Sequence, residues 1–412
     1  MRFLHLSDLH FGKVIHGLSL LENGDQGAWV DRFLELTDRV KPDAVVIAGD
    51  VYDRSAPSGD AVQLLSRMLT ALSEREIPVL MTAGNHDSLQ RLSFAAPLLA
   101  RQGVHISRML SQSPLLSHVS LADENGPVTF WLMPYVFPAL IGQVLGEDCP
   151  RDFDGAVRAL LERQGVDLSQ RNVLIAHQNV TANGAEGIRG GSESMVGGVG
   201  QIDYSAFDGF DYVALGHIHA SYCVGRETVR YAGSPLCYHF DETRQAAKGP
   251  VLVELGAKGE PVRMETQILP ALHPMREMRG AYEQLRDQAL ADLRRGEYLR
   301  IVLTDRRMTQ EISAFFRELY SARESVVLEI VSEYSPFHDL TSAAGATAET
   351  QSLEELFAAF YAERRGGMPD EQESELLSVA GELTRHSEGG VNPSPAQVGK
   401  LLAFLMEQEE KQ

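Results

Sequence analysis

Short apolar segments rich in strand-forming residues recur along the first half of the chain, and each of them ends in a polar cluster. These segments occupy residues 2–7, 44–48, 77–83, 128–133, 172–176 and 211–215. Helix-period segments lie between several of them, at 28–40 and 59–76. Strands that alternate with helices predict an α/β layered domain. In such domains, sites form just beyond the C-terminal ends of the strands.

A second, smaller module is predicted after the proline-spaced stretch 261–274. Its pattern indicates helix, strand, helix and strand at 281–295, 297–304, 309–321 and 325–332. Residues 335–350 are small and polar, as in a linker. Helical patterns return at 352–364, 370–384 and 395–409. We therefore expect an α/β main domain, a small α/β module and a helical segment, over residues 1–268, 275–334 and 350–412.

Composition places the chain among water-soluble globular proteins. Of its 412 residues, 44% are apolar and 23% are charged. No apolar run reaches the roughly 20 residues of a membrane helix. The opening MRFLHLSDLHF lacks the apolar stretch of a signal peptide, so we expect a cytoplasmic protein without membrane contact. Cys149, Cys223 and Cys237 form no C-x-x-C pair, which favours reduced thiols over a disulfide or a thiolate metal site.

The net charge of −20 argues against a general nucleic-acid-coating role. From Thr341 onward there are 13 acidic and 5 basic residues, a net charge of −8. Leu353, Leu356, Phe357 and Phe360 share one helical face there. This segment is either a cap folded onto its own protein or a docking site for a partner.

Polar clusters directly after the predicted strands carry the candidate chemistry. Strand alternation would send Asp8 and His10 to the same side, where both can bind one cation. Gly49 permits a tight turn before Asp50, whose carboxylate can bridge two cations. Asn85 offers a neutral oxygen ligand, and the adjacent His86 is free to donate a proton. Each short motif alone also occurs in ordinary turns.

Histidines complete the set. His177 closes one predicted strand, where a lone histidine is more often structural. His217 and His219 follow another predicted strand, and alternation would place both side chains on the same side. Nitrogen and oxygen ligands without thiolate suit Mn²⁺, Mg²⁺, Fe²⁺ or Zn²⁺. Seven ligands are too many for one ion and suit two, which together can hydrolyse a phosphoester.

The ordered clusters resemble those of the calcineurin-like metallophosphoesterases. The motifs are D-x-H, G-D-x-x-D, G-N-H-D, a single histidine and G-H-x-H, spread over about 220 residues. Segments 84–106, 190–203, 210–220 and 231–242 further resemble the SbcD family of bacterial exonuclease subunits. The resemblance implies a four-layer α/β sandwich at 1–268, a capping domain at 275–334 and a helical attachment segment at 350–412.

The resemblance also implies a role for each candidate residue. One ion would be held by Asp8, His10, Asp50 and His219, and the other by Asp50, Asn85, His177 and His217. His86 matches the catalytic histidine of the family, and Asp53 matches the acid that orients it. Manganese is the preferred ion, although magnesium or iron also fits the ligands. Nearby Asp87, His16, His239 and Cys237 are interpreted as supporting or structural residues.

The implied activity is that of a DNA nuclease: an ATP-stimulated 3′–5′ exonuclease on double strands and an endonuclease on single strands and hairpins. The implied partners are DNA, an SbcC-type SMC-like ATPase bound through the C-terminal helices, and a second copy of the chain within a heterotetramer. Residues 59–76 and 89–102 are candidate dimer helices, although their apolar faces equally suit their own sheet. The alternatives are a small-substrate metallophosphoesterase, acting on cyclic nucleotides or phosphoproteins, and a non-enzymatic scaffold.

Overall fold

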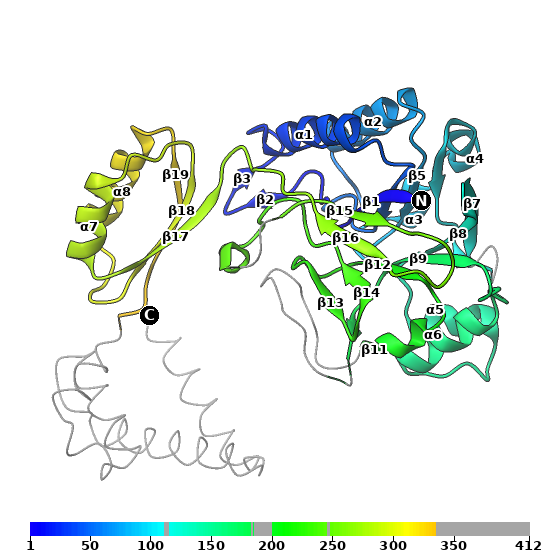
Figure 1. Ribbon diagram of the computed structural model, residues 1–412. Coiled ribbons are helices and arrows are strands. Elements are labelled where there is room, and N and C mark those ends of the chain that lie inside the picture. Colours follow the sequence, from blue (N-terminus) through cyan, green and yellow to red (C-terminus); the bar gives the residue numbers. More distant parts are fainter. Residues whose placement is uncertain (111–114, 183, 185–199, 245–247, 335–412) are drawn as a thin grey trace, which may run out of the picture. The chain divides into compact units, whose positions relative to one another are not determined.

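A computed structural model describes residues 1–110, 115–182, 184, 200–244 and 248–334 (Figure 1). Residues Met1–Glu333 form one compact unit. The predicted linker at 335–350, the helical segment at 350–412 and most of the glycine-rich stretch 190–203 lie outside the described residues. No helix among the described residues combines the length and apolar character needed to cross a membrane.

The first of two large sheets has six strands, in the order β16-β15-β1-β4-β5-β6. Strands β1, β4, β5 and β6 run parallel, whereas β15 is antiparallel to both β1 and β16. The strands are Arg2–Leu6 (β1), Ala44–Ala48 (β4), Val79–Thr82 (β5), Val104–Ile106 (β6), Val251–Glu254 (β15) and Arg263–Thr266 (β16). The C-terminal ends of the four parallel strands therefore share one edge of this sheet.

The second sheet also has six strands, in the order β13-β14-β12-β9-β8-β7, with β14, β12, β9 and β8 parallel. Its strands are Ser117–Asp123 (β7), Gly126–Met133 (β8), Arg171–His177 (β9), Tyr212–Gly216 (β12), Tyr222–Val224 (β13) and Arg226–Tyr231 (β14). Two small two-stranded sheets add Val14–Ile15 (β2), Leu18–Ser19 (β3), Val180–Thr181 (β10) and Ile202–Asp203 (β11).

Three buried apolar clusters stack the layers on one another. The first joins helices α1 (Asp25–Val40) and α2 (Gly59–Glu74) to one face of the first sheet. The second fills the space between the two sheets, where Phe3 packs edge-on against Phe130 and Tyr212. The third joins the far face of the second sheet to α5 (Pro138–Leu145) and α6 (Phe153–Glu162). Figure 1 shows the resulting order of helices, sheet, sheet and helices.

The stretch 89–102, a candidate dimer helix in the sequence, is not one helix. It contains two single-turn helices, α3 (Leu89–Leu92) and α4 (Ala96–Leu99), and a 3-10 turn at Ala100–Gln102. The break has a local cause, because Ala95 has a left-handed φ of 58° and Pro97 follows in the first turn of α4. In contrast, α2 is continuous and is capped by Ser58, whose side chain accepts a hydrogen bond from the Ala61 amide.

A small parallel α/β module follows the two sheets. It has three strands in the order β17-β18-β19, and Met278, Ile301 and Phe316 lie in its own buried cluster. Its elements are Met275–Gly280 (β17), Tyr282–Ala291 (α7), Tyr298–Leu303 (β18), Gln310–Ser321 (α8) and Val326–Ser332 (β19). Strand β17 had no counterpart in the sequence prediction, because its residues MREMRG alternate weakly and are mostly only half-buried.

An ion-pair cluster at the end of β7 offers a test of how this fold is held together. The Asp123 carboxylate accepts hydrogen bonds from Arg171 and from the N-terminal ammonium of Met1, and only 6% of its side chain is exposed. The hydrogen bonds from Arg171, followed by those from the N-terminus, hold the pKa of Asp123 well below its usual range. This contact ties β7 and β9 to the start of β1.

We expect Asp123→Ala to lower the free energy of unfolding by about 3 kcal/mol at pH 7, because it leaves the Arg171 charge buried. Since the folded-state pKa of Asp123 is depressed, its contribution is present above the unfolded value of about 3.9 and is lost as the pH falls below it. Urea unfolding of both proteins between pH 7 and pH 3 measures this difference. Asp38→Ala, at an exposed pair with Arg75, serves as the control and should change little. A difference that stays constant with pH contradicts the prediction.

Candidate metal centre

The candidate residues gather where the C-terminal ends of both large sheets meet. Asp8 and His10 follow β1, Asp50 follows β4, and Asn85 and His86 follow β5. His177 ends β9 in the second sheet, and His217 and His219 follow β12. The site is therefore built from loops of two sheets, and five strand ends contribute to it.

The loops reach this geometry through left-handed backbone, and not through strand alternation. Strand β1 ends at Leu6 and β12 ends at Gly216, so the D-x-H and H-x-H pairs lie outside the strands. Asp8, His10, Asp50 and His217 have φ values of 53°, 42°, 48° and 106°. Left-handed φ is uncommon for residues other than glycine, and it concentrates at functional sites. The alternation argument for these pairs was therefore wrong, although the side chains do converge.

Two glycines of the sequence motifs are required because neighbouring atoms approach their Cα atoms too closely for a side chain. A Cβ atom at Gly216 would overlap the carbonyl oxygen of Ala48, and one at Gly84 would overlap the Asp50 carboxylate. Neither glycine has left-handed φ, so space and not backbone freedom requires them. Any larger residue at these two positions would push the two sheets, or the β4 and β5 loops, apart.

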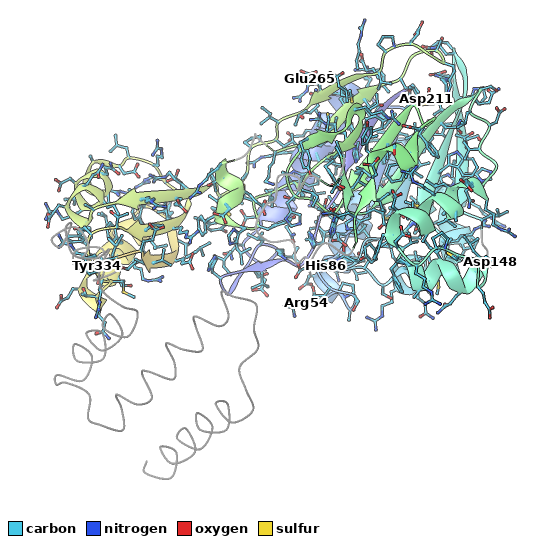
Figure 2. All side chains as sticks on the ribbon, turned by 90° about the horizontal axis from the view of Figure 1, so that it is seen from below. Arg54, His86, Asp148, Asp211, Glu265 and Tyr334 are labelled. Carbon is cyan, nitrogen blue, oxygen red and sulfur yellow. The ribbon has the colours of Figure 1, made fainter. Side chains whose placement is uncertain are left out.

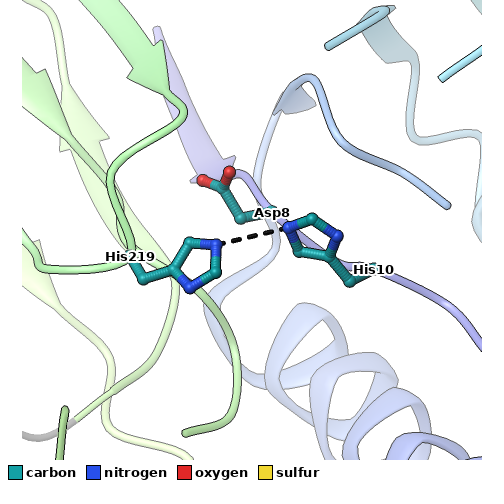
Figure 3. Close-up of side chains that lie close together, drawn as sticks. All are labelled: Asp8, His10 and His219. Atoms are coloured by element: carbon teal, nitrogen blue, oxygen red, sulfur yellow. Dashed lines mark hydrogen bonds between the residues drawn. The ribbon is translucent and has the colours of Figure 1, made fainter. Parts of the chain in front are cut away.

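Asp8, His10 and His219 form the first of three groups that could hold a metal ion (Figure 3). Their ligand atoms lie within 4.8 Å of one another, and all three residues are buried. The Nε2 atoms of His10 and His219 face each other at 3.3 Å. The Asp8 carboxylate is held from the other side by the main-chain N–H of His217, at 3.1 Å.

Asp50 belongs to both of the other groups. It is grouped with Asp8 and His177 in one of them, and with His10 and His86 in the other. Its Oδ2 atom lies 3.3 Å from His177 Nε2 and 3.6 Å from His10 Nε2. The carboxylate thus lies between the two histidines, as a bridging ligand requires.

Asn85 brings the remaining histidine to this centre. Its Oδ1 atom lies 3.0 Å from His177 Nε2 and 3.2 Å from His217 Nδ1. His177 also points Nδ1 at the carbonyl oxygen of Ala48, at 2.8 Å. Because a carbonyl only accepts, Nδ1 carries a hydrogen, and Nε2 is the nitrogen that faces Asn85 and Asp50.

The charge and protonation of this cluster fit a divalent cation. Asp8 and Asp50 are at most 2% exposed, and no Lys or Arg side chain in the described ranges contacts either of them. Burial, and then the charge of His177, lowers the pKa of His217 to about 3, and burial also holds the pKa of His10 well below its usual value. These imidazoles are neutral at pH 7 and can bind a metal. Two buried carboxylates without a Lys or Arg partner are costly unless a cation joins them.

Protons on His177 and Asp8 compete with the cation. Burial favours a neutral His177 ring, but the nearby Asp50 carboxylate outweighs burial and raises the pKa of His177 to about 9. Burial also raises the pKa of Asp8 to about 6. Metal binding must displace such protons, and acid therefore weakens it.

His86 sits at the open side of the cluster, in the same region as Arg54 (Figure 2). Its main-chain N–H donates to Asp50 Oδ1 at 2.9 Å, and its ring stands edge-on to His10. Its Nδ1 lies 2.9 Å from the main-chain oxygen of Asp53. The expected contact with the Asp53 carboxylate is absent from the described contacts, because that carboxylate is 2.8 Å from Lys13 Nζ.

Comparisons with known proteins agree with this geometry. The model of the calcineurin-like phosphoesterase family matches residues 1–221, more than half of the chain. The SbcD subunit of the SbcCD nuclease from Staphylococcus saprophyticus is 31% identical over 330 residues, which cover 78% of this chain and 82% of that protein. The chain belongs to the SbcD family. The resemblance found in the sequence motifs is thus confirmed.

Two further matches extend the similarity beyond the sheets. A second family model, the type 5 capsule protein repressor C-terminal domain, matches residues 271–365. The SbcD subunit of the SbcCD nuclease from Staphylococcus epidermidis is 28% identical over 311 residues, covering 74% of this chain and 79% of that protein. Like other calcineurin-like members, this SbcD-family protein is a metallophosphoesterase, a hydrolase that acts on phosphodiester bonds.

Some residues of the SbcD-family site had no assigned role in the sequence. Glu242 is buried, and its Oε1 atom lies 3.2 Å from His219 Nδ1, while Lys248 Nζ lies 2.8 Å from its other oxygen. Tyr238 donates to the main-chain oxygen of Leu9 at 2.7 Å, and its ring packs against both His10 and His219. Segment 231–242 resembled the family, but nothing local in it pointed to a partner more than 200 residues earlier.

The other neighbouring residues lie outside the cluster. Asp87 accepts hydrogen bonds from the main-chain N–H groups of Val51, Tyr52 and Gly84, and so joins the β4 and β5 loops. His239 pairs with Asp241 at 3.2 Å, and the His16 ring lies tilted against Phe240. Cys237 is partly buried, and burial raises the pKa of its thiol to about 11. In the described groups of metal-binding side chains, none of these residues takes part.

Proposed function

We propose that this protein is the nuclease subunit of an SbcCD-type DNA repair complex, acting in the cytoplasm as a manganese-dependent, two-metal phosphodiesterase. The observation that carries the proposal is Asp50, whose carboxylate lies between His177 of one sheet and His10 of the other. The proposed activities are ATP-stimulated 3′–5′ exonuclease cleavage of double strands and endonuclease cleavage of single strands and hairpins. Both Staphylococcus relatives are named as nucleases, which supports a nucleic acid as the substrate.

The seven proposed ligands divide into two sets that share Asp50. Asp8, His10 and His219 complete one set, and Asn85, His177 and His217 complete the other. When bound, two divalent cations supply positive charge to both oxygens of an in-line displacement and lower the pKa of water. The carboxylates and imidazoles of the chain fix where that charge lies.

His86 is the proposed proton donor. Its Nδ1 hydrogen is committed to the Asp53 carbonyl, so Nε2 is left to contact the scissile phosphate and give its proton to the leaving oxygen. Asp53 is therefore a positioning residue for His86 through its main chain.

The substrate class is tested by comparing hairpin DNA, bis-p-nitrophenyl phosphate and cyclic AMP as substrates in manganese, with and without an SbcC-type ATPase. We expect cleavage of hairpin DNA, stimulation by ATP with the partner present, and loss of all activity in EDTA. Absence of DNA cleavage even with the ATPase present, alongside hydrolysis of cyclic AMP, would favour the small-substrate alternative.

The proposed domain plan assigns 1–268 to the nuclease, 275–334 to the cap and 350–412 to attachment of the ATPase. Deleting residues 350–412 is expected to abolish binding of the SbcC-type partner while manganese-dependent cleavage by the free subunit persists. A pull-down beside a hairpin cleavage assay measures both. Retained binding by the truncated chain would place the attachment elsewhere.

A second copy of the chain is the proposed occupant of an apolar groove beside α2. The groove measures about 670 Å³ and is lined by Val62, Leu65 and Leu69 of α2 and by Leu92, Phe94 and Leu99 after it. Phe94 is 81% exposed, which is unusual for so large an apolar side chain. We propose that this surface packs against its symmetry mate in a homodimer.

A charged side chain introduced on this surface should dissociate the proposed homodimer. Phe94→Glu is expected to convert a dimer to a monomer in sedimentation or light scattering, because two carboxylates would be buried at the symmetric contact. Leu168→Glu, at another exposed apolar position, is the control. A monomeric wild-type protein, or a dimeric Phe94→Glu variant, would contradict this interface.

A further inference from the structure

The histidines of the two proposed cation sites differ in the group that faces the ring nitrogen pointing away from the site. In His219, the Nδ1 atom that points away from the site is 3.2 Å from Glu242 Oε1. Glu242 is 1% exposed and is fixed by Lys248 at 2.8 Å and by the main-chain N–H of Tyr238 at 3.2 Å. Lys248 also donates to the main-chain oxygen of His219, so one lysine anchors both ends of this contact.

His10 also faces a carboxylate that pairs with a lysine, but at a longer distance. Its Nδ1 atom is buried without a hydrogen-bond partner, and the carboxylate oxygen that faces it, Asp53 Oδ1, lies 3.6 Å away. Lys13 holds that oxygen at 2.8 Å. His10 and His219, the two histidines grouped with Asp8, thus each face a carboxylate that pairs with a lysine.

The other site has no such support among the described residues. His177 is backed by the neutral carbonyl oxygen of Ala48, at 2.8 Å. Its companions Asn85 and His217 are exposed and half-buried, respectively. A carboxylate behind an imidazole raises the basicity of the ligand nitrogen and fixes the ring, whereas a carbonyl fixes the ring with less charge.

We propose that the pairs Glu242–Lys248 and Asp53–Lys13 make the two cation sites unequal. The site of Asp8, His10 and His219 holds its ion tightly, and the site of Asn85, His177 and His217 holds an ion that exchanges readily. Glu242 is a positioning residue that acts through His219. The inference rests on the proposed two-metal function, but it concerns the affinity of each site and not the substrate.

Manganese titration of the full-length protein tests this, with free Mn²⁺ measured by its paramagnetic resonance signal. The wild-type chain should show two binding steps of different affinity. Glu242→Gln keeps the size of the side chain and removes its charge, and we expect the tighter step to weaken about 10–100-fold. Asn85→Ala should weaken the other step and leave the tighter one within about threefold of wild type.

Glu297→Gln is the matched control, since Glu297 is another buried carboxylate that pairs with a basic side chain, Arg276 of the small module. It should alter neither step. The melting temperature of each metal-free variant shows whether it is folded, and Asp53→Asn provides a second test of the tight step if Glu242→Gln does not fold.

The possible outcomes distinguish failure of the unequal-site proposal from failure of the proposed two-metal function on which it rests. No manganese binding by the wild-type chain would overturn the proposed function. Two equal steps in the wild type, or equal weakening of both steps in Glu242→Gln, would overturn only the inequality of the sites. An unchanged tight step in folded Glu242→Gln would remove Glu242 from the positioning role.

Discussion

Replacing Asp50 with asparagine is expected to lower the rate of phosphodiester cleavage at least about 10³-fold, which corresponds to about 4 kcal/mol of transition-state stabilisation. Asp50 belongs to two of the three groups of metal-binding side chains, and its carboxylate faces His10 and His177. The amide keeps the shape of the side chain but loses the charge that two cations would share. Both cation sites should therefore weaken in the same variant.

Hairpin cleavage in manganese and metal content after gel filtration measure the two effects together. Asp38→Asn, at an exposed ion pair with Arg75, is the control for the same chemical change and should behave as wild type. A variant that has lost its metal but still cleaves DNA would refute the bridging role of Asp50. Unchanged cellular repair by Asp50→Asn would instead revive the non-enzymatic scaffold.

Replacing His86 with glutamine is expected to lower the cleavage rate about 10²- to 10⁴-fold while leaving manganese binding close to that of wild type. The ring lies at the open side of the cluster, and its position is set by two main-chain contacts, its own N–H to Asp50 and its Nδ1 to the Asp53 carbonyl. Glutamine can hydrogen-bond to a phosphate but cannot protonate a leaving oxygen.

Single-turnover cleavage beside a manganese titration distinguishes this role from ligation. If His86→Gln loses a binding step, His86 acts as a ligand, as its grouping with His10 and Asp50 would allow. A substrate with a leaving group that needs no proton, such as p-nitrophenolate, should restore much of the rate. His118→Gln, on the exposed face of β7, is the control.

The central strands β1, β4, β5, β8, β9 and β12 were predictable because most of their residues are buried. Residues 44–48 form β4 at the same positions, β9 extends the segment 172–176 by one residue at each end, and β12 is displaced by one residue from 211–215. The edge strands β6, β7, β13 and β16 and the interior strands β14 and β15 had no counterpart in the sequence prediction. Strand β7 alternates between half-buried and exposed residues, and β16 is short and follows a proline.

The site residues were predictable as a set, but their geometry was not. Strand ends followed by Asp, Asn and His were enough to select the loops. The convergence of Asp8 with His10 depends on two left-handed residues, which alternation in a strand cannot produce. Glu242 and Lys248 were not predictable, because their contacts with His219 come from a fold in which 23 and 29 residues separate the partners.

The seven proposed ligands come from both large sheets, and this has a consequence for the lifetime of the protein. Asp8, His10, Asp50 and Asn85 belong to loops of one sheet, and His177, His217 and His219 to the other. Bound cations therefore cross-link the sheets, and at 100 times its dissociation constant one ion adds about 2.7 kcal/mol to the free energy of unfolding. Proteases cleave the opened chain, and its population falls as that free energy rises. We therefore expect the supply of the bound metal to affect the turnover of this enzyme as well as its activity.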